Sequence, residues 1–244
     1  MAKKGGGRTN LLRLTALCGT AAPILMAVLW TTAILLRPGY DPMLQYGSEL
    51  GQGSNAWIQN TNFAVTGFLI VMFSLGLQRT FNPGRGSRLG PGLLLLFGAC
   101  ELATGFLPCD PACPIPGTSL SQSIHNLLAV VAFVTLPLAP LTLSALFKKD
   151  RLWIPVTAYS RATGIVTFCL SAVFLAGSFA QASWKGLAEI LLVAVPFLWI
   201  ETVALRMLKT TETGQRLDAS IVGTFGFLIN STINRPIRPN DCGG

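Results

Sequence analysis

The chain has 244 residues, of which 51% are hydrophobic and only 11% are charged, and its mean hydropathy is +0.55. Soluble domains usually carry about 25% charged residues, so this composition excludes an ordinary soluble domain and indicates one that lies in a lipid bilayer. The net charge of +8 does not predict a nucleic-acid partner, because the basic residues lie between apolar runs rather than along one polar face.

Six apolar stretches are long enough to cross the hydrocarbon core, which takes about 20 residues. In chain order they are Leu14–Leu36, Trp57–Leu77, Leu89–Leu107, Ile124–Phe147, Ala162–Ala180 and Gly186–Leu208. The first is too long for the apolar region of a signal peptide, so we expect it to be retained. These stretches predict an all-α, six-helix transmembrane domain over residues 14–208. A basic arm over residues 1–13 precedes it, and a polar, disordered tail over residues 209–244 follows.

The distribution of basic residues predicts the orientation of the six spans. Sixteen of the 18 lysines and arginines lie in the N-terminal arm, in the second and fourth loops, or on the C-terminal side. The other side carries only Arg37 and Lys185. Because basic residues favour the cytoplasmic side, we expect a multi-pass protein of the plasma (inner) membrane with both termini in the cytoplasm.

Most of the polar residues outside the cytoplasmic segments lie at the outer ends of the spans or in the outer loops. Glu101 lies about 10 Å below the outer end of the third span, on a stripe of small residues with Gly98 and Gly105. Asn60 begins a similar stripe on the second span. Such stripes predict that both side chains point into the bundle, either to bind a ligand or to join helices. The predicted ligand-binding residues are Tyr40, Asp41, Asn60, Asn62, Glu101 and Glu189.

His125, the only histidine, opens the fourth span among Ser121, Gln122, Ser123 and Asn126, and Asp110 precedes it in the same outer loop. A carboxylate beside an imidazole suits general acid–base chemistry. The alternative is an interfacial histidine bonded to water. The candidate catalytic residues are therefore His125, Asp110, Glu49 as a base or metal ligand, and Ser48 as a nucleophile.

Cys109 and Cys113 enclose a short loop on the outer side, where thiols are oxidised, so a disulfide is the preferred interpretation. A structural zinc site is less favoured because only one histidine could join these two thiols. No cofactor can be named from the sequence.

Several short motifs occur in a characteristic order. They are Arg37-Pro38-Gly39-Tyr40-Asp41-Pro42, Ser48-Glu49-Leu50-Gly51, Asn62-Phe63 with Gly67, Gly105-Phe106-Leu107-Pro108-Cys109-Asp110, and His125-Asn126-Leu127. Together they make the chain, over roughly residues 10–208, resemble an uncharacterised six-span family of bacterial and archaeal membrane proteins, the domain of unknown function nine-nine-eight. The resemblance implies six helices and a plasma-membrane location, and it supplies no established activity. The Cys109/Cys113 loop and the tail depart from the family pattern.

Three functions fit these observations. The first is binding or transport of a lipid or another small amphiphile in a polar pocket at the outer leaflet, rimmed by Tyr40 and Trp57. The second is a membrane-embedded hydrolase or transferase that acts on lipid through the Asp/His/Glu residues. The third is an accessory membrane subunit without chemistry of its own.

Overall fold

The structure, a computed structural model, describes residues 3–81, 88–115 and 117–233, with side chains described between residues 7 and 213. Within these residues every regular element is helical, which confirms the all-α prediction. A short 3-10 helix, η1 (Gly47–Gly51), lies between the first two α-helices. The α-helices are α1 (Lys3–Leu36), α2 (Ala56–Thr80), α3 (Leu89–Thr104), α4 (Leu120–Phe147), α5 (Ile154–Phe179) and α6 (Lys185–Ile233).

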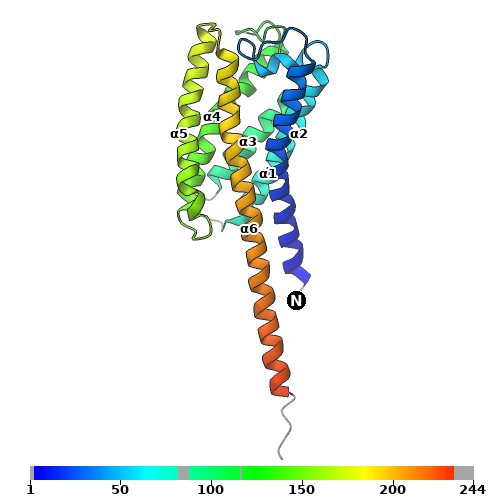
Figure 1. The fold of residues 1–244 in the computed structure, drawn as a ribbon, viewed down its shortest axis with the longest axis vertical. Helices are drawn as coiled ribbons and strands as arrows, with labels where there is room; N and C mark the ends of the chain where they lie inside the picture. The colour runs from blue at the N-terminus through cyan, green and yellow to red at the C-terminus, as the bar shows by residue number, and fades with distance from the viewer. Residues whose placement is uncertain (1–2, 82–87, 116, 234–244) are drawn as a thin grey trace, which may run out of the picture.

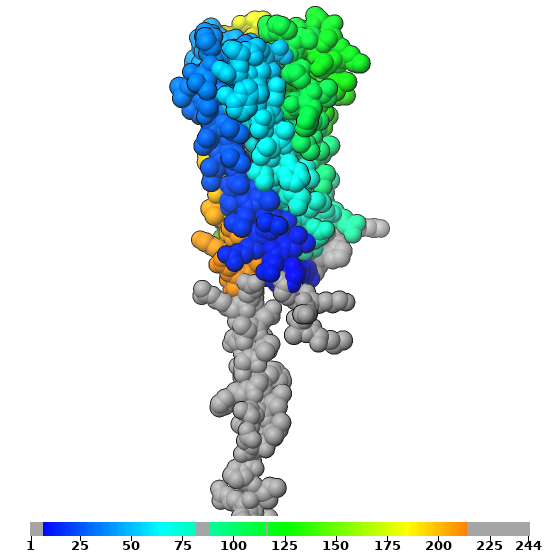
Figure 2. Space-filling view, turned by 90° about the vertical axis from the view of Figure 1, so that its right-hand side faces the viewer, coloured from blue at the N-terminus to red at the C-terminus, as the bar shows by residue number. Residues whose placement is uncertain are grey.

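The six helices form a closed ring in chain order (Figure 1). Each helix contacts the next along the chain, and α6 returns against α1. Successive helices run in opposite directions, so residues 37–55, 105–115, 117–119 and 180–184 lie at one end of the bundle, which we call the polar end. Figure 2 shows α1 and α2 side by side along one face, with the green segment that follows α3 beside them at the polar end.

The opposite end, which we call the basic end, brings together segments that carry most of the basic residues. The Arg8 guanidinium donates to the carbonyl oxygen of Arg79 at 3.1 Å, which joins the start of α1 to the end of α2. The Arg206 Nε donates to the carbonyl oxygen of Leu152 at 2.6 Å, which joins α6 to the connection between α4 and α5.

Five helices are long and apolar enough to cross a membrane, and they carry large apolar side chains on the outside of the bundle. Examples of exposed side chains are Leu35, Phe68, Phe168, Phe179 and Leu198. An apolar surface over whole helices is unfavourable in water and favourable in lipid, because a helix satisfies its own backbone hydrogen bonds. The chain is therefore a multi-pass membrane protein.

The third predicted span forms a shorter helix than the other five. Its helix, α3, ends at Thr104 rather than Leu107 and has 16 residues, a length of about 24 Å. Beyond it, the amide of Gly105 bonds to the carbonyl of Glu101 and the amide of Phe106 to that of Ala103, so the chain turns out of the helix. α3 is thus a shorter apolar helix, below the length of the other five.

Neither predicted boundary of the transmembrane domain coincides with a helix end. α1 begins at Lys3, inside the predicted basic arm, and the backbone of α6 continues to Ile233, beyond the predicted end of the sixth span at Leu208. The disorder of the tail stays a prediction, and residues 234–244 lie outside the described part of the chain.

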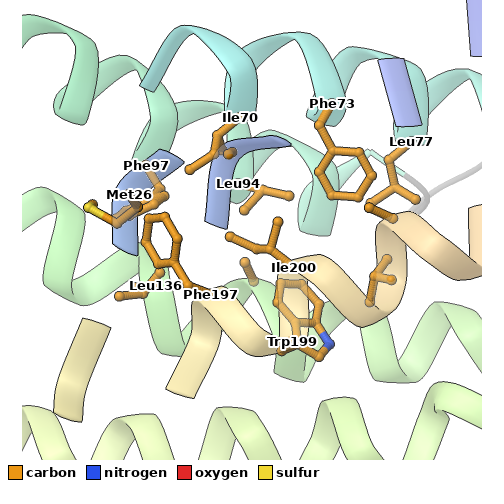
Figure 3. Close-up of a cluster of buried hydrophobic side chains, with 14 of the residues drawn as sticks. Met26, Ile70, Phe73, Leu77, Leu94, Phe97, Leu136, Phe197, Trp199 and Ile200 are labelled. Carbon is orange, nitrogen blue, oxygen red and sulfur yellow. The ribbon is translucent and has the colours of Figure 1, made fainter. Parts of the chain in front are cut away.

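Apolar side chains fill the centre of the ring, as Figure 3 shows. Phe97 of α3 meets Phe197 of α6 edge to face, with ring centroids 6.1 Å apart. Trp199 is fully buried beside them and donates to the Ser160 hydroxyl of α5 at 2.8 Å. Toward the basic end, Phe147 stacks on Trp153 with centroids 4.9 Å apart. Large apolar and aromatic side chains are therefore buried from the middle of the bundle toward the basic end.

The closest approach between helices joins α2 and α3 through the predicted stripes of small residues. A Cβ added at Gly98 would lie 2.9 Å from the carbonyl oxygen of Gly67, and one added at Gly105 would lie 2.6 Å from that of Asn60. A Cβ at Gly67 would meet the Gly98 carbonyl oxygen at 2.6 Å. Real Cβ atoms do not approach backbone this closely, so the two stripes pack backbone against backbone, as membrane helices with small residues do.

Gly67→Ala should destabilise the bundle, because the added methyl group forces α2 away from α3 and such overpacking typically costs about 1–3 kcal/mol. Thermal unfolding in detergent, followed by circular dichroism, measures the effect. Gly92→Ala on α3 is the matched control, since a Cβ there meets nothing within 4 Å. Equal melting temperatures for the two variants would contradict the backbone contact.

Candidate functional site

A cavity of about 540 Å³ extends from the polar end toward the middle of the bundle. All six helices contribute to its wall, together with the segments that follow α1 and α3. The polar side chains in the wall are Tyr46, Ser48, Glu101, Thr104, His125, Asn126, Ser171, Ser178, Gln181 and Glu189. The cavity is therefore the candidate functional site.

Between α4 and α5 the wall of the cavity is apolar and reaches the outer surface of the bundle. Val130 and Val134 of α4 and Phe168, Leu175 and Phe179 of α5 line the cavity. All five are also exposed, from 49% upward. The apolar part of the cavity therefore reaches the outer surface of the bundle between α4 and α5.

A close helix contact marks the inner limit of this opening. A Cβ added at Gly164 of α5 would lie 3.0 Å from the carbonyl oxygen of Pro137 and closer still to the side chain of Leu141. The cavity-lining residue Phe168 lies one turn further toward the polar end. α4 and α5 therefore touch at Gly164 and enclose the cavity beyond it.

Glu189 of α6 joins the segment after α1 to the cavity wall. Its side chain is only 8% exposed, and Oε2 accepts a hydrogen bond from the Gly47 amide at 2.8 Å. A second contact supports this one, since the Gly186 amide donates to the Met43 carbonyl oxygen at 2.9 Å. A Cβ at Gly186 would lie 2.5 Å from the Pro42 carbonyl oxygen. The segment is thus held against the start of α6.

Glu101 lies in the cavity wall, as its place on the small-residue stripe predicts. Its Oε2 is enclosed and makes no hydrogen bond, although a buried polar atom ordinarily has a partner. The charges of Glu101 and Glu189 interact electrostatically. The cavity therefore contains a carboxyl group with unused hydrogen-bonding capacity.

His125 also lies in the cavity wall and is 5% exposed. Its Nδ1 lies 2.9 Å from the carbonyl oxygen of Leu107. A carbonyl can only accept, so Nδ1 carries the proton, and Nε2 of the neutral ring is an acceptor. The expected pair between His125 and Asp110 is not formed, because each side chain has other partners.

Asp110 instead organises the loop between α3 and α4. Its carboxylate accepts hydrogen bonds from Thr118 at 2.6 Å and from Ser119 at 2.8 Å, and these hydrogen bonds hold its pKa below the usual value. The stabilisation is present above the ordinary aspartate pKa and is lost as the pH falls through the lowered one. The Asp110 amide donates to the buried Gln122 side chain, which also donates to the Pro114 carbonyl oxygen at 3.2 Å. Asp110 is thus a structural residue of this loop.

Ser48 lies in the cavity wall next to Cys113. The structure joins Cys109 and Cys113 by a disulfide, with Cα atoms 5.1 Å apart. The Ser48 hydroxyl lies 3.3 Å from the Cys113 sulfur, to which it can donate. Ser48 therefore has the disulfide and not the imidazole of His125 as its neighbour.

Three of the predicted site residues in the segment after α1 are outside the cavity wall. Glu49 caps η1 by accepting from the Tyr46 amide at 3.0 Å, and Asp41 accepts from the Met43 amide at 2.8 Å in a turn. The Tyr40 hydroxyl donates to the Gln45 carbonyl oxygen at 3.2 Å. Burial raises the pKa of Tyr40, and so do the negative charges of Glu189, Glu49 and Asp41. The phenol therefore stays protonated as a donor.

Asn60 and Asn62 are also outside the cavity wall and join segments of the bundle. Asn62 is fully buried and donates to the Met26 carbonyl oxygen of α1 at 3.3 Å, while its oxygen accepts from Thr66 at 3.1 Å. Asn60 donates to the Gly51 carbonyl oxygen at 3.3 Å. Both contacts support the structural alternative for these residues. The predicted rim residue Trp57 is 67% exposed and likewise does not line the cavity.

Sequence reasoning missed the aromatic residues of the cavity. Tyr46 and Phe174 meet edge to face at 5.9 Å, Phe133 lies 5.2 Å from Phe174, and Trp30 also lines the wall. Nothing in the sequence separates these rings from ordinary core residues. Among the described residues no three His, Cys, Asp or Glu side chains lie close enough to hold a metal ion.

Glu189→Ala should loosen the segment after α1, because it leaves the buried Gly47 amide without an acceptor, at a cost of about 1–3 kcal/mol. Glu189→Gln is the control, since its amide oxygen can still accept this hydrogen bond. Limited proteolysis within residues 37–55, together with thermal unfolding, measures the effect. A Glu189→Ala variant as resistant as wild type would show that this hydrogen bond does not hold the segment.

Comparison with known proteins assigns the chain to a family. Neither a curated protein nor a solved structure matches it. The sequence profile of a family described as protein of unknown function (DUF998) matches residues 20–206, a range that includes every residue of the cavity wall. Because the match covers most of the chain and agrees with the motifs, the protein belongs to the DUF998 family of unknown function.

Proposed function

We propose that this protein binds or transports a lipid or another small amphiphile in the cavity, which it offers to the outer leaflet of the plasma membrane. The cavity itself carries the proposal. It combines a polar end, with Glu101, His125 and Glu189, and an apolar opening between α4 and α5. Ligand sites are typically apolar with a few converging polar groups, and their volume is about 300–1,000 Å³.

The two parts of the cavity match the two parts of an amphiphile. An acyl chain would lie between Val134 of α4 and Phe168 and Leu175 of α5, where it exchanges lipid contacts for protein contacts at little cost. The head would lie among the polar groups near the polar end. The filled core around Phe97 and Phe197 supports access from the side rather than along the axis of the bundle.

The proposed orientation puts the basic end in the cytoplasm, with both termini there, and makes α3 a sixth span. The sixteen basic residues assigned to this side support it, and so do the contacts of Arg8 with Arg79 and of Arg206 with Leu152. α3 leads from the basic end to the polar end, and the turn at residues 105–107 adds to its length.

A lipid hydrolase or transferase is the second candidate, because Ser48 and His125 line the same cavity. The contacts of Ser48 and His125 support an enzyme less than they support ligand binding. A serine nucleophile needs a base within hydrogen-bond reach, whereas the Ser48 hydroxyl lies against the Cys113 sulfur and His125 bonds to the Leu107 carbonyl.

Filling the cavity tests ligand binding. Ala129 of α4 lines the cavity, and Ala129→Trp should occupy the space of the ligand. Mass spectrometry of the lipid extract should find an amphiphile that co-purifies with the wild-type protein, and about tenfold less of it with this variant. Leu127→Trp is the control, because Leu127 is 62% exposed on the same helix and is not part of the wall. No co-purifying amphiphile in any of the three proteins would count against the proposal, and so would equal amounts in wild type and Ala129→Trp.

Cysteine labelling in right-side-out membrane vesicles tests the orientation. Ser54 lies exposed at the polar end and Lys149 at the basic end. In a variant that lacks Cys18, Cys100, Cys169 and Cys242, an impermeant maleimide should label Ser54→Cys in intact vesicles. It should label Lys149→Cys only after permeabilisation. The reverse pattern would invert the orientation.

A further inference from the structure

The charged groups in the cavity wall are all acidic. Glu101 comes from α3 and Glu189 from α6, and the wall includes no lysine or arginine. Lys185 places its ammonium group 4.6 Å from the centre of the Tyr46 ring and donates to the Gln181 side chain at 2.7 Å. The Glu189 charge also interacts with Glu49, so the acidic character extends behind the wall.

Two enclosed hydroxyl groups in the wall, those of Tyr46 and Ser178, are each 6% exposed and interact with each other. The Glu101 Oε2 is enclosed as well and has no hydrogen-bond partner. A buried polar atom without a partner is unfavourable, so a ligand whose positively charged head approaches this oxygen gains a contact that the protein alone does not make. These groups converge on the polar end of the cavity from α3, α5 and the segment before η1.

Aromatic rings surround the same region. Tyr46 packs edge to face with Phe174, and Trp30 lies in the wall near Gly47, where its ring leaves no room for a Cβ. Aromatic faces attract ammonium groups, most strongly where water is excluded. Carboxylates, hydroxyl oxygens and ring faces are together the groups that bind an organic cation.

We infer that the ligand is a cationic amphiphile, a long-chain amine or quaternary ammonium compound, with its head between Glu101, Glu189 and the aromatic rings. Its chain lies between α4 and α5. This inference rests on the proposed function and adds the chemical class of the ligand.

Other head groups fit the cavity less well. A sulfate or phosphate would lie beside two carboxyl groups with no basic residue in the wall to neutralise it, and burying a charge without a partner is strongly unfavourable. A phospholipid with an ammonium group carries this phosphate as well. An uncharged head supplies no counter-ion to the two carboxyl groups. A single positive charge neutralises the pair when the two carboxyl groups share one proton.

Equilibrium binding to the full chain in phosphatidylcholine nanodiscs, with empty discs subtracted, tests the inference. The probes are four C12 amphiphiles: dodecyltrimethylammonium, dodecanol, dodecyl sulfate and the lysophosphatidylcholine with a C12 chain. Dodecyltrimethylammonium should bind about tenfold or more tightly than each of the others, since close charge pairs in a water-excluded site contribute strongly to affinity.

Glu101→Gln and Glu189→Gln should each weaken dodecyltrimethylammonium binding by about tenfold and leave dodecanol binding unchanged. Glu201→Gln is the matched control, because Glu201 lies on α6 outside the cavity wall. Circular dichroism checks that each variant is folded, and having two separate variants keeps the test valid if one is not.

The outcomes separate this inference from the proposed function. If dodecanol binds as tightly as dodecyltrimethylammonium and Ala129→Trp abolishes both, amphiphile binding stands and the cationic class is wrong. The class is also wrong if lysophosphatidylcholine binds most tightly, or if both glutamine variants bind the cation like wild type. If no amphiphile binds above the empty discs, the proposed function and this inference both fail.

Discussion

The backbone contact between α2 and α3 determines where the polar groups of this bundle lie. Gly98 and Gly105 pack against the backbone of α2, and Glu101 lies between them in the sequence, one turn from each. Once these glycines are in place, the rotation of α3 is fixed, and the Glu101 side chain is directed at the edge of the contact, into the cavity wall. A bulkier residue at either glycine would turn or displace the helix and carry the carboxyl group with it. The position of the Glu101 carboxyl group thus depends on Gly98 and Gly105, because neither has a side chain to separate the two helices.

Membrane helices and their order could be predicted from the sequence, because hydrophobic length is a strong signal and lipid leaves few alternatives. The small-residue stripes also predicted which faces of α2 and α3 approach other helices closely, although not that the two stripes meet each other. The length of α3 could not be obtained in this way. Its apolar run continues through Phe106 and Leu107, and only the local hydrogen bonds show that the chain turns at Gly105.

The candidate site was predicted less completely, for a physical reason. Glu101, His125, Glu189 and Ser48 lie in the cavity wall, since polar residues at the polar end of a bundle have few other places to go. Asp110, Glu49 and Asp41 are as polar, but they bond within their own loops, where neighbouring hydroxyls and amides are close in sequence. Such local partners compete with distant residues for the same side chain, and composition alone does not show which hydrogen bond forms. Tyr46 and Trp30 could not be identified because an aromatic residue in a cavity wall looks in sequence like one in a core.

The filled core at the middle of the bundle has a kinetic consequence. If the cavity holds a ligand as proposed, the core around Phe97 and Phe197 would block its exit along the axis of the bundle, and the ligand would leave by the gap between α4 and α5 through which it arrived. Arrival and departure then cross the same barrier. A substitution that narrows this gap without touching the bound ligand slows both steps by the same factor, so it lengthens the residence time and leaves the affinity unchanged. α4 carries Pro137 at this gap and Pro140 one turn beyond, and each removes a hydrogen bond from the helix. The helix that borders this gap therefore lacks two of the backbone hydrogen bonds that would resist its bending.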